Sequence, residues 1–450
     1  MRKNDIVEID ITSYTHEGLG VGRVDGYVLF VPQAACGDRL KCLVVKTLSS
    51  HGYAKILEIL TPSPDRKAPD CKVFEHCGGC CFRHISYEAE LEAKRIFAAS
   101  ELRKGLGRDV PCKPCVPSPY VLQYRNKALI PFGQAGYGFY KPRSHDIVLC
   151  EHCPIQSKEA SFAASVLQSH IRKFGISAYD ELSHTGLVRG IFVRTARATG
   201  QVMVVVIING NKIPHCEELT VSLKAGLQGL ASVQICKNKK RTNVPLDGEF
   251  EVLYGSRYIE DVLAKNRYRI SAQSFYQINS AQCEALYEAA MQLAGLSGEE
   301  RVLDLYCGIG TIGLTLAKNA LEVVGVEIVP DAIEDAQYAV DINGIKNATF
   351  ITADAASAAK QLAAAGFAAD VVILDPPRKG CEAQLLGTVA EMSPEKIVYI
   401  SCNPPTLARD ARLLEEFGYK ITGSAAPFDM FAGTSHVETV VLLSKAACTV

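Results

Sequence analysis

The feature that most constrains the fold is a series of apolar strand-like segments in the last third of the chain. They lie at 301–305, 322–327, 349–351, 371–374 and 396–400. Each is followed by a turn and, in most cases, by a segment with helical character. Continuous apolar strands that alternate with helices are typical of parallel sheets covered on both faces. The sequence therefore predicts an α/β fold, with a Rossmann-like doubly wound sheet over this part of the chain.

The first of these strands ends in a turn suited to a nucleotide. Gly308 and Gly310 precede a predicted helix at 312–319, and Glu327 ends the next strand. A Gly-rich strand-to-helix turn lets the backbone approach a nucleotide, and an acid ending the second strand binds ribose hydroxyls. Only two glycines fit, so the full dinucleotide fingerprint is absent. The segment 304–310 instead resembles the first motif of S-adenosylmethionine-dependent methyltransferases, which would place Asp354 against the adenine.

Three further residues at or near strand ends are candidates for a chemical role. Cys402 follows the strand at 396–400, where doubly wound sheets bind ligands; the alternative is a buried structural cysteine. Asp375 precedes paired prolines, which favour a rigid turn that aims the carboxyl group at a flipped pyrimidine; the alternative is a helix cap. Glu438 interrupts an apolar strand predicted at 434–441, which is costly unless the carboxylate is used or paired; the alternative is an edge-strand salt bridge.

The N-terminal 60 residues predict a small barrel. Strand patterns lie at 5–11, 27–31, 38–46 and 52–60, the glycines at 18, 20 and 22 break the alternation, and we expect five short strands in all over these 60 residues. This density indicates a closed barrel of the OB type. The Gly-rich turn and return strand at 18–31 resemble the RNA-binding TRAM domain. The charges of this segment balance, so the alternative is a barrel without a ligand.

A cysteine cluster follows the barrel. Cys71, Cys77, Cys80 and Cys81 lie within eleven residues, with two glycines between them. Four thiolates hold either zinc or an iron–sulfur cluster, and spacing alone does not separate the two. Cys153 is the expected fourth ligand beside Cys71, Cys77 and Cys80, while Cys81 and Cys150 are possible substitutes. The chain begins without a signal peptide and lacks a long apolar run, so we expect a cytoplasmic protein with reduced thiols.

The segment 103–143 is strongly basic although the whole chain has a net charge of −1. It holds eight basic residues against one acid, with six interleaved aromatic residues. Phosphate contacts and stacking faces suit single-stranded RNA, whereas the alternative is a solvated hairpin surface. From there to about 270, a hairpin over 190–209 and a helix over 213–227 indicate an α+β region without a catalytic set of its own.

Together these motifs resemble the RNA uracil-5-methyltransferase family. The resemblance is carried by Phe-Tyr-Gln-Ile-Asn at 275–279, Asp-Leu-Tyr-Cys-Gly-Ile-Gly-Thr at 304–311, Asp-Pro-Pro-Arg-Lys-Gly at 375–380, Ser-Cys-Asn-Pro-Pro-Thr-Leu-Ala-Arg-Asp at 401–410 and His-Val-Glu at 436–438. The front barrel and the cysteines look most like the branch that acts on 23S ribosomal RNA. Ala432 replaces the proline usual before the catalytic glutamate, and Ala272 and Gln273 also depart from the commoner residues.

The resemblance implies a role for each residue. Cys402 would attack carbon 6 of a flipped uracil, and Glu438 would remove the carbon 5 proton. S-adenosylmethionine would be the methyl donor. The residues expected to hold the cofactor or the base are Gln277, Tyr306, Glu327, Asp354 and Asp375. A 4Fe-4S cluster on the four cysteines is preferred over zinc, and the enzyme would be a monomer acting on RNA without a membrane.

The expected domains are an RNA-binding barrel at 1–60, a central α+β domain at 61–270 that carries the iron–sulfur site and an RNA-binding surface, and a methyltransferase domain at 271–450. Four rivals stay open. A tRNA uracil-5 enzyme would use the same chemistry, and a cytosine-5 enzyme would place a cysteine at the Asp375 motif. A radical enzyme would need Cys-x3-Cys-x2-Cys, whereas the first gap here is five residues. A non-catalytic ribosome-assembly factor would not need Cys402, Asp375 and Glu438 together.

Overall fold

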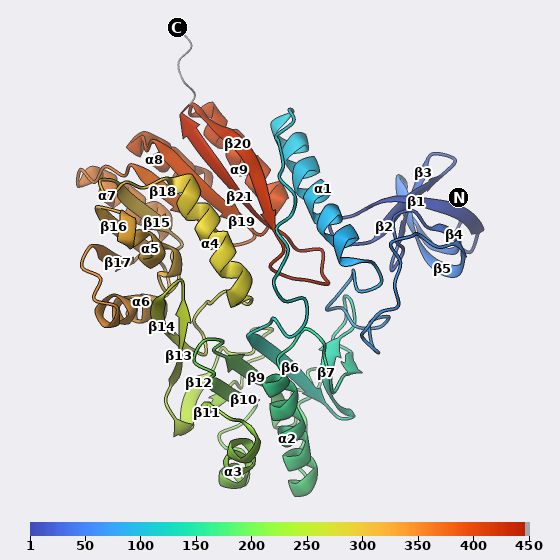
Figure 1. Cartoon of the computed structure of the whole chain (residues 1–450). Helices are drawn as coiled ribbons and strands as arrows, with labels where there is room; N and C mark the ends of the chain where they lie inside the picture. Colours follow the sequence, from blue (N-terminus) through green and yellow to red (C-terminus); the bar gives the residue numbers. More distant parts are fainter. Residues whose placement is uncertain (446–450) are drawn as a thin grey trace.

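The structure is a computed structural model that describes residues 1–445 (Figure 1). Its N-terminal part is a closed barrel with strand order β1-β2-β3-β5-β4. The strands are β1 (Ile6–Tyr14), β2 (Gly20–Val24), β3 (Tyr27–Val31), β4 (Arg39–Thr47) and β5 (His51–Thr61). A Cβ added at Gly22 would lie 2.5 Å from the Asp10 carbonyl oxygen, so glycine is what lets β1 and β2 approach. The predicted five-stranded barrel is confirmed.

The central part is a seven-stranded sheet with order β12-β11-β10-β9-β6-β7-β8. Helices α2 and α3 share one apolar core with β6, β9, β10 and β11, and the predicted hairpin is the antiparallel pair β9–β10. A separate two-stranded sheet leads to the C-terminal part. The bounds are β6 (Lys127–Gly133), β7 (Gly136–Tyr140), β8 (Ile147–Leu149), α2 (Lys158–Phe174), β9 (Val188–Thr195), β10 (Val202–Ile208), α3 (Cys216–Gly226), β11 (Leu230–Lys237), β12 (Glu249–Gly255), β13 (Tyr258–Leu263) and β14 (Asn266–Ser271).

The C-terminal sheet has the order β17-β16-β15-β18-β19-β21-β20 and confirms the predicted α/β architecture. β15 to β19 are parallel, whereas β21 pairs antiparallel with both β19 and β20. The bounds are α4 (Ser280–Ala294), β15 (Arg301–Leu305), α5 (Thr311–Leu316), β16 (Glu322–Glu327), α6 (Pro330–Ile342), β17 (Ala348–Thr352), α7 (Ala355–Ala364), β18 (Val371–Leu374), α8 (Ala383–Met392), β19 (Lys396–Ser401), α9 (Pro404–Glu416), β20 (Tyr419–Phe428) and β21 (Glu438–Lys445).

Successive residues of these strands feed two different cores, as the alternation of strand side chains requires. Val302 packs with α4 and α6, while Leu303 packs with α7, α8 and α9. The sheet is therefore covered on both faces by helices, and its strand ends are left as the place for a ligand.

Helix α1 (Tyr87–Leu106) belongs to the second of these cores although it comes early in the chain (Figure 1). Leu102 and Leu106 are buried with Leu407 and Ala408 of α9. The segment after α1 forms isolated bridges to β20, at Ala425 and Phe428. The predicted domain boundaries stay predictions, and residues 446–450 of the third domain lie outside the described residues; the packing nevertheless joins 87–116 to the C-terminal sheet.

No helix within residues 1–445 combines the length and the apolar character needed to cross a membrane.

Candidate active site at the strand ends

Five of the predicted site residues lie where parallel strands of the C-terminal sheet end. The registers of β15, β16 and β18 place Leu305 beside both Val326 and Leu374. The residues that follow these positions therefore share one edge of the sheet. At that edge, in strand order, stand Asp354 after β17, Glu327 at the end of β16, Tyr306 after β15, Asp375 after β18 and Cys402 after β19.

Glu438 reaches the same edge from the opposite direction. It is the first residue of β21, and Ser401 of β19 pairs with Thr439. The next positions along the ladder are Cys402 and Glu438, so the register sets the thiol opposite the carboxyl group. Because β21 lies between β19 and β20 and Glu438 has no ion pair within residues 1–445, the edge-strand salt-bridge alternative is wrong.

Burial and mutual repulsion perturb the three groups together. Burial, with the Asp375 charge adding to it, raises the pKa of Glu438 to about 8, and Arg378 opposes this. Burial also raises the pKa of Asp375 to about 7. Burial and the charges of Glu438 and Asp375 raise the pKa of the Cys402 thiol to about 12. Near neutral pH, the site therefore combines a protonated thiol with two carboxyl groups poised to exchange protons.

Arg378 and His436 complete this group, and sequence reasoning assigned them no role although both stand in the quoted motifs. Arg378 Nη2 lies 3.4 Å from His436 Nε2, and the Arg378 carbonyl accepts a 2.8 Å bond from Asn403 Nδ2. Burial and the Arg378 charge lower the pKa of His436 to about 4, so the imidazole is neutral at physiological pH. Arg378 is exposed, and its charge opposes the rise in the pKa values of Glu438 and Cys402.

The Gly-rich turn is tied to the acid that ends β16. The Gly308 amide donates to Glu327 Oε2 at 3.2 Å, and the amides of residues 328 and 329 donate to Oε1 at 2.8 and 3.0 Å. Gly308 has φ +56°, and a Cβ added there would meet no atom within 4 Å. The backbone at Gly308 therefore faces open space, which suits a turn that approaches a nucleotide, whereas Gly310 packs against Phe350.

Sequence reasoning did not single out Asp304, which lies inside β15. Its Oδ2 accepts from the Gly313 amide at 2.9 Å, while its buried Oδ1 has no partner. Burial raises the pKa of Asp304 to about 8, with Asp375 and Glu327 adding to the shift. The signal was present in the sequence, because a carboxylate interrupts the apolar run 302–305. An orphaned oxygen beneath the Gly-rich turn suits a donor group of a bound cofactor.

The other residues expected to bind the cofactor or the base interact with neighbouring parts of the protein. Asp354 is exposed and caps α7 by accepting from the Ser357 amide at 3.0 Å. Gln277 is buried, and its main-chain oxygen accepts from Asn126 Nδ2 at 2.8 Å. Tyr306 is half-buried at φ +67°, and burial beside Cys381 raises the pKa of its phenol. Their roles in cofactor binding stay predictions.

The four predicted metal ligands lie near one another at the surface of the central part. Burial raises the pKa of Cys77, and Cys153 and Cys71 add to the shift. Burial also raises the pKa of Cys80, and Cys153 and Cys77 add to that shift. The Gly79 amide donates to Cys77 Sγ at 3.4 Å. No group of three or more metal-binding side chains in residues 1–445 is arranged to hold an ion. The donor chemistry suits a thiolate site, and the cluster itself remains a proposal.

The basic segment 103–143 is only partly the stacking surface expected from the sequence. Three of its six aromatic rings, those of Tyr124, Phe132 and Tyr137, are buried in apolar cores. Tyr120 and Tyr140 are exposed. Five of the eight basic side chains pair with acids, at Arg103, Lys104, Arg108, Lys141 and Arg143. The alternation of aromatic residues therefore partly reflects strands that bury one face.

Comparisons with known proteins agree on one family. Residues 199–446 match the tRNA (uracil-5-)-methyltransferase family, and residues 2–57 match the TRAM domain. An RNA methyltransferase of Halalkalibacterium halodurans is 42% identical over 98% of each chain, and one of Listeria monocytogenes is 40% identical over 98% of each chain. A solved structure of the Pyrococcus abyssi tRNA (uracil-54, C5)-methyltransferase with S-adenosyl-L-homocysteine is 29% identical, covers 97% of this chain and 100% of its own, and has a TM-score of 0.80.

The raised pKa of Glu438 predicts a pH-dependent gain in stability for Glu438→Gln. An unfolded glutamate ionises near pH 4.3, whereas the folded group ionises near 8, so the native state binds the extra proton between these values. Wild-type stability should therefore fall as pH rises through this window. We expect denaturant unfolding to show the variant more stable by at least about 1 kcal/mol at pH 8, with the difference vanishing near pH 4.

The exposed Glu391→Gln serves as the matched control and should follow the wild type. An equal offset between Glu438→Gln and the wild type at pH 5 and pH 8 would contradict the perturbed ionisation of Glu438.

Proposed function

We propose that this chain, which belongs to the tRNA (uracil-5-)-methyltransferase family, transfers a methyl group from S-adenosylmethionine to carbon 5 of a uridine in RNA through a covalent Cys402–uracil intermediate. The observation that carries the mechanism is the register that sets Cys402 opposite Glu438 beside Asp375. The TRAM barrel supports RNA as the substrate. We further propose that the enzyme acts as a cytoplasmic monomer.

The first step of the proposed mechanism activates the ring. Carbon 5 of uracil is a poor nucleophile, so sulfur attacks carbon 6 and the displaced π electrons move to the carbon 4 oxygen as an enolate. Cys402 is protonated at neutral pH, and its proton leaves as the sulfur–carbon bond forms. We assign this proton to the Asp375 carboxylate, whose charge contributes to the raised thiol pKa, so that Glu438 is left to act as the base in the second step. Asp375, with a pKa of about 7, is able to accept from or donate to the polar edge of a flipped base.

The second step restores the aromatic ring. When bound, S-adenosylmethionine would supply the methyl group as an electrophile: the enolate electrons form the bond from carbon 5 to the methyl group, the carbon 4 carbonyl re-forms, and S-adenosylhomocysteine is the leaving group. Glu438 then takes the carbon 5 proton, the electrons of that bond re-form the carbon 5–carbon 6 double bond, and the Cys402 thiolate is expelled. A positioned base of this kind contributes about 10²–10⁴-fold. The raised pKa of Glu438 makes it a stronger base than an ordinary glutamate, although less of it is ionised at pH 7.

The cofactor is assigned to the Gly-rich turn and its neighbours. Glu327 would contact the ribose and Tyr306 the methionyl part, with Asp354 near the adenine and Gln277 near the base or the cofactor. The open backbone at Gly308 and the unpartnered Asp304 Oδ1 support a polar ligand at this edge. Asp304 is added here to the residues expected from the sequence.

We propose 23S ribosomal RNA as the substrate and test it against tRNA. The whole-chain similarity to an enzyme described as acting on tRNA means that the domain architecture does not separate the two substrates. We expect tritiated methyl groups to enter unmodified 23S ribosomal RNA, and 5-methyluridine mapping to place them at discrete uridines. Unmodified tRNA is the parallel sample. Incorporation into tRNA alone would replace ribosomal RNA as the substrate, and 5-methylcytidine as the product would reject uracil chemistry.

The covalent intermediate is tested by two variants. Cys402→Ala should lose turnover altogether, because no other described thiol lies at the end of β19. Glu438→Gln should still methylate but stall as an RNA–protein adduct that survives a denaturing gel. Cys216→Ala, at a half-buried cysteine on α3, is the control and should behave as the wild type. Normal methylation by Cys402→Ala would exclude it as the nucleophile, and free product at the wild-type rate from Glu438→Gln would exclude it as the base.

We also propose that Cys71, Cys77, Cys80 and Cys153 hold a 4Fe-4S cluster, with no step of the reaction routed through it. Protein purified without oxygen should be brown, with an absorbance band at about 400 nm. It should contain iron and sulfide in equal amounts. Cys77→Ser should lose the colour, whereas Cys216→Ser should keep it. A colourless protein with one zinc ion would establish the other thiolate site.

A further inference from the structure

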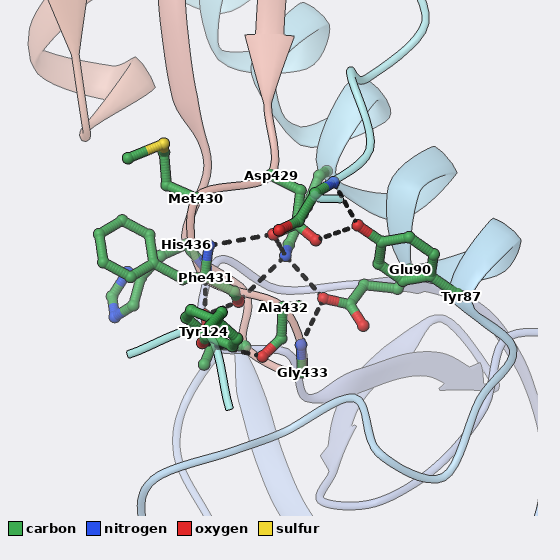
Figure 2. A network of polar contacts seen from close by, with 12 residues as sticks. Tyr87, Glu90, Tyr124, Asp429, Met430, Phe431, Ala432, Gly433 and His436 are labelled. Atoms are coloured by element: carbon green, nitrogen blue, oxygen red, sulfur yellow. Dashed lines mark hydrogen bonds and ion pairs between the residues drawn. The ribbon is translucent and has the colours of Figure 1, made fainter. Parts of the chain in front are cut away.

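A buried ion network joins helix α1 to the loop that leads into Glu438 (Figure 2). Lys94 Nζ lies 2.6 Å from Glu90 Oε1 and 2.6 Å from Asp429 Oδ1, and it also donates to the Phe431 carbonyl at 3.3 Å. The Lys94 and Asp429 side chains are fully buried, and that of Glu90 is 5% exposed. Burying such a cluster is costly unless the charges are paired, so loss of one charged residue leaves its partners buried without a counter-charge.

Lys94 stays charged in this network, whereas burial, with the Asp429 charge adding to it, raises the pKa of Glu90 although Lys94 opposes the shift. Burial would lower the pKa of Lys94, but Glu90 and Asp429 outweigh burial, so the lysine stays an ammonium ion. The Tyr87 hydroxyl donates to Asp429 Oδ2 at 2.7 Å and accepts from the Ser118 amide at 2.7 Å. Helix α1 therefore bonds to both oxygens of the Asp429 carboxylate, and the Tyr87 hydroxyl links the main chain at Ser118 to the same group.

The loop 429–437 is held at further points along its length. The Gly433 amide donates to Glu90 Oε1 at 2.7 Å, and its carbonyl accepts from the amides of Cys81 and Phe82 at 2.9 and 3.0 Å. The Tyr124 hydroxyl donates to the Ala432 carbonyl at 3.0 Å (Figure 2). Gly433 has φ +84°, and a Cβ there would lie 3.0 Å from Arg83 Nη1. Helix α1, the cysteine segment and the central part therefore all bond to this one loop.

Strand register connects the network to the reaction site. β20 and β21 form a hairpin in which Phe428 pairs with Glu438, and Asp429 is the next residue after Phe428. The anchor thus lies directly beside the cross-strand partner of Glu438. A displacement of Asp429 would be passed to Glu438 through one ladder position, while Cys402 is held by β19 on the other side.

We propose that Lys94, with Glu90 and Asp429, positions Glu438 for removal of the carbon 5 proton by anchoring the 429–437 loop to helix α1; this rests on the proposed role of Glu438. These three are positioning residues, because none lies among the groups assigned to the substrate. The ion pair of half-buried Arg95 with exposed Glu92 lies on the same helix and, within residues 1–445, forms no hydrogen bond or ion pair with the loop, so it serves as the comparison.

The test compares Lys94→Met with Arg95→Met in the full-length protein. We expect Lys94→Met to lower kcat for RNA methylation by about tenfold to hundredfold, the range for a misplaced catalytic group. The KM for RNA and the affinity for S-adenosylmethionine should stay within about twofold, because the cofactor turn is untouched. Since the slowed step follows methyl transfer, Lys94→Met should also accumulate the denaturation-resistant RNA adduct. Arg95→Met should behave as the wild type in all three measurements.

Hydrogen exchange supplies a readout that does not depend on the chemistry. Peptides spanning 429–437 should exchange faster in Lys94→Met than in Arg95→Met, with peptides of β15 to β18 unchanged. Tyr87→Phe removes one bond to Asp429 without removing a charge, and it should shift exchange and adduct in the same direction by less. It also serves as the test variant if Lys94→Met does not fold.

The two proposals fail in different ways. Unchanged exchange across 429–437, or activity lost only in proportion to the folded fraction, would overturn the anchoring role. An adduct in Glu438→Gln without one in Lys94→Met would overturn it as well. If neither variant accumulates an adduct, the base assignment for Glu438 fails, and faster exchange would then support the anchor alone.

Discussion

The site depends on the antiparallel insertion of β21 between β19 and β20. Parallel strands bring only their carboxyl ends to the ligand-binding edge, so each contributes the residue that follows it. A strand that runs the other way contributes the residue with which it begins. Glu438 begins β21 beside the end of β19, and the Ser401–Thr439 pair fixes which residue faces Cys402. The register between β19 and β21 therefore brings together a thiol and a carboxyl group that lie far apart in the sequence.

This arrangement costs stability, and the surrounding structure offsets the cost. Asp304, Asp375 and Glu438 are all buried enough for their pKa values to rise to about 8, 7 and 8, so each opposes folding when ionised. Lys94, one loop away, is the opposite case, because Glu90 and Asp429 outweigh burial and raise the pKa of its ammonium group. Removing one partner from a buried pair typically costs about 3–5 kcal/mol. The loop before Glu438 is thus held by charged hydrogen bonds, whereas ionisation of the site's own carboxyl groups is disfavoured, chiefly by burial.

The sequence predicts the C-terminal sheet well because its strands are continuous apolar runs, each ended by a polar residue at the edge. Cys402 and Asp375 stand out for that reason. Glu438 stands out as an acid next to an apolar run, although β21 begins at Glu438 and not at 434 as the sequence predicts. Asp304 carries the same signal but lies inside the quoted motif, where its burial is not visible. Lys94 carries no signal, since a lysine in a charged helix reads as solvated, and its partner Asp429 lies 335 positions away. Tyr124 and Phe132 show the opposite case. Aromatic residues next to cations predict an exposed stacking surface, but both rings are buried in the core.

The packing also implies that the catalytic unit is discontinuous in the chain. Leu102 and Leu106 of α1 complete an apolar core that the C-terminal helices leave open, and the 112–116 segment extends the pairing of β20. The cysteine segment then bonds to Gly433 and packs Cys81 against Gly18 of the barrel. Cys81 therefore contacts both the TRAM barrel and the 429–437 loop, so the cysteine segment connects the barrel to the loop that leads into Glu438.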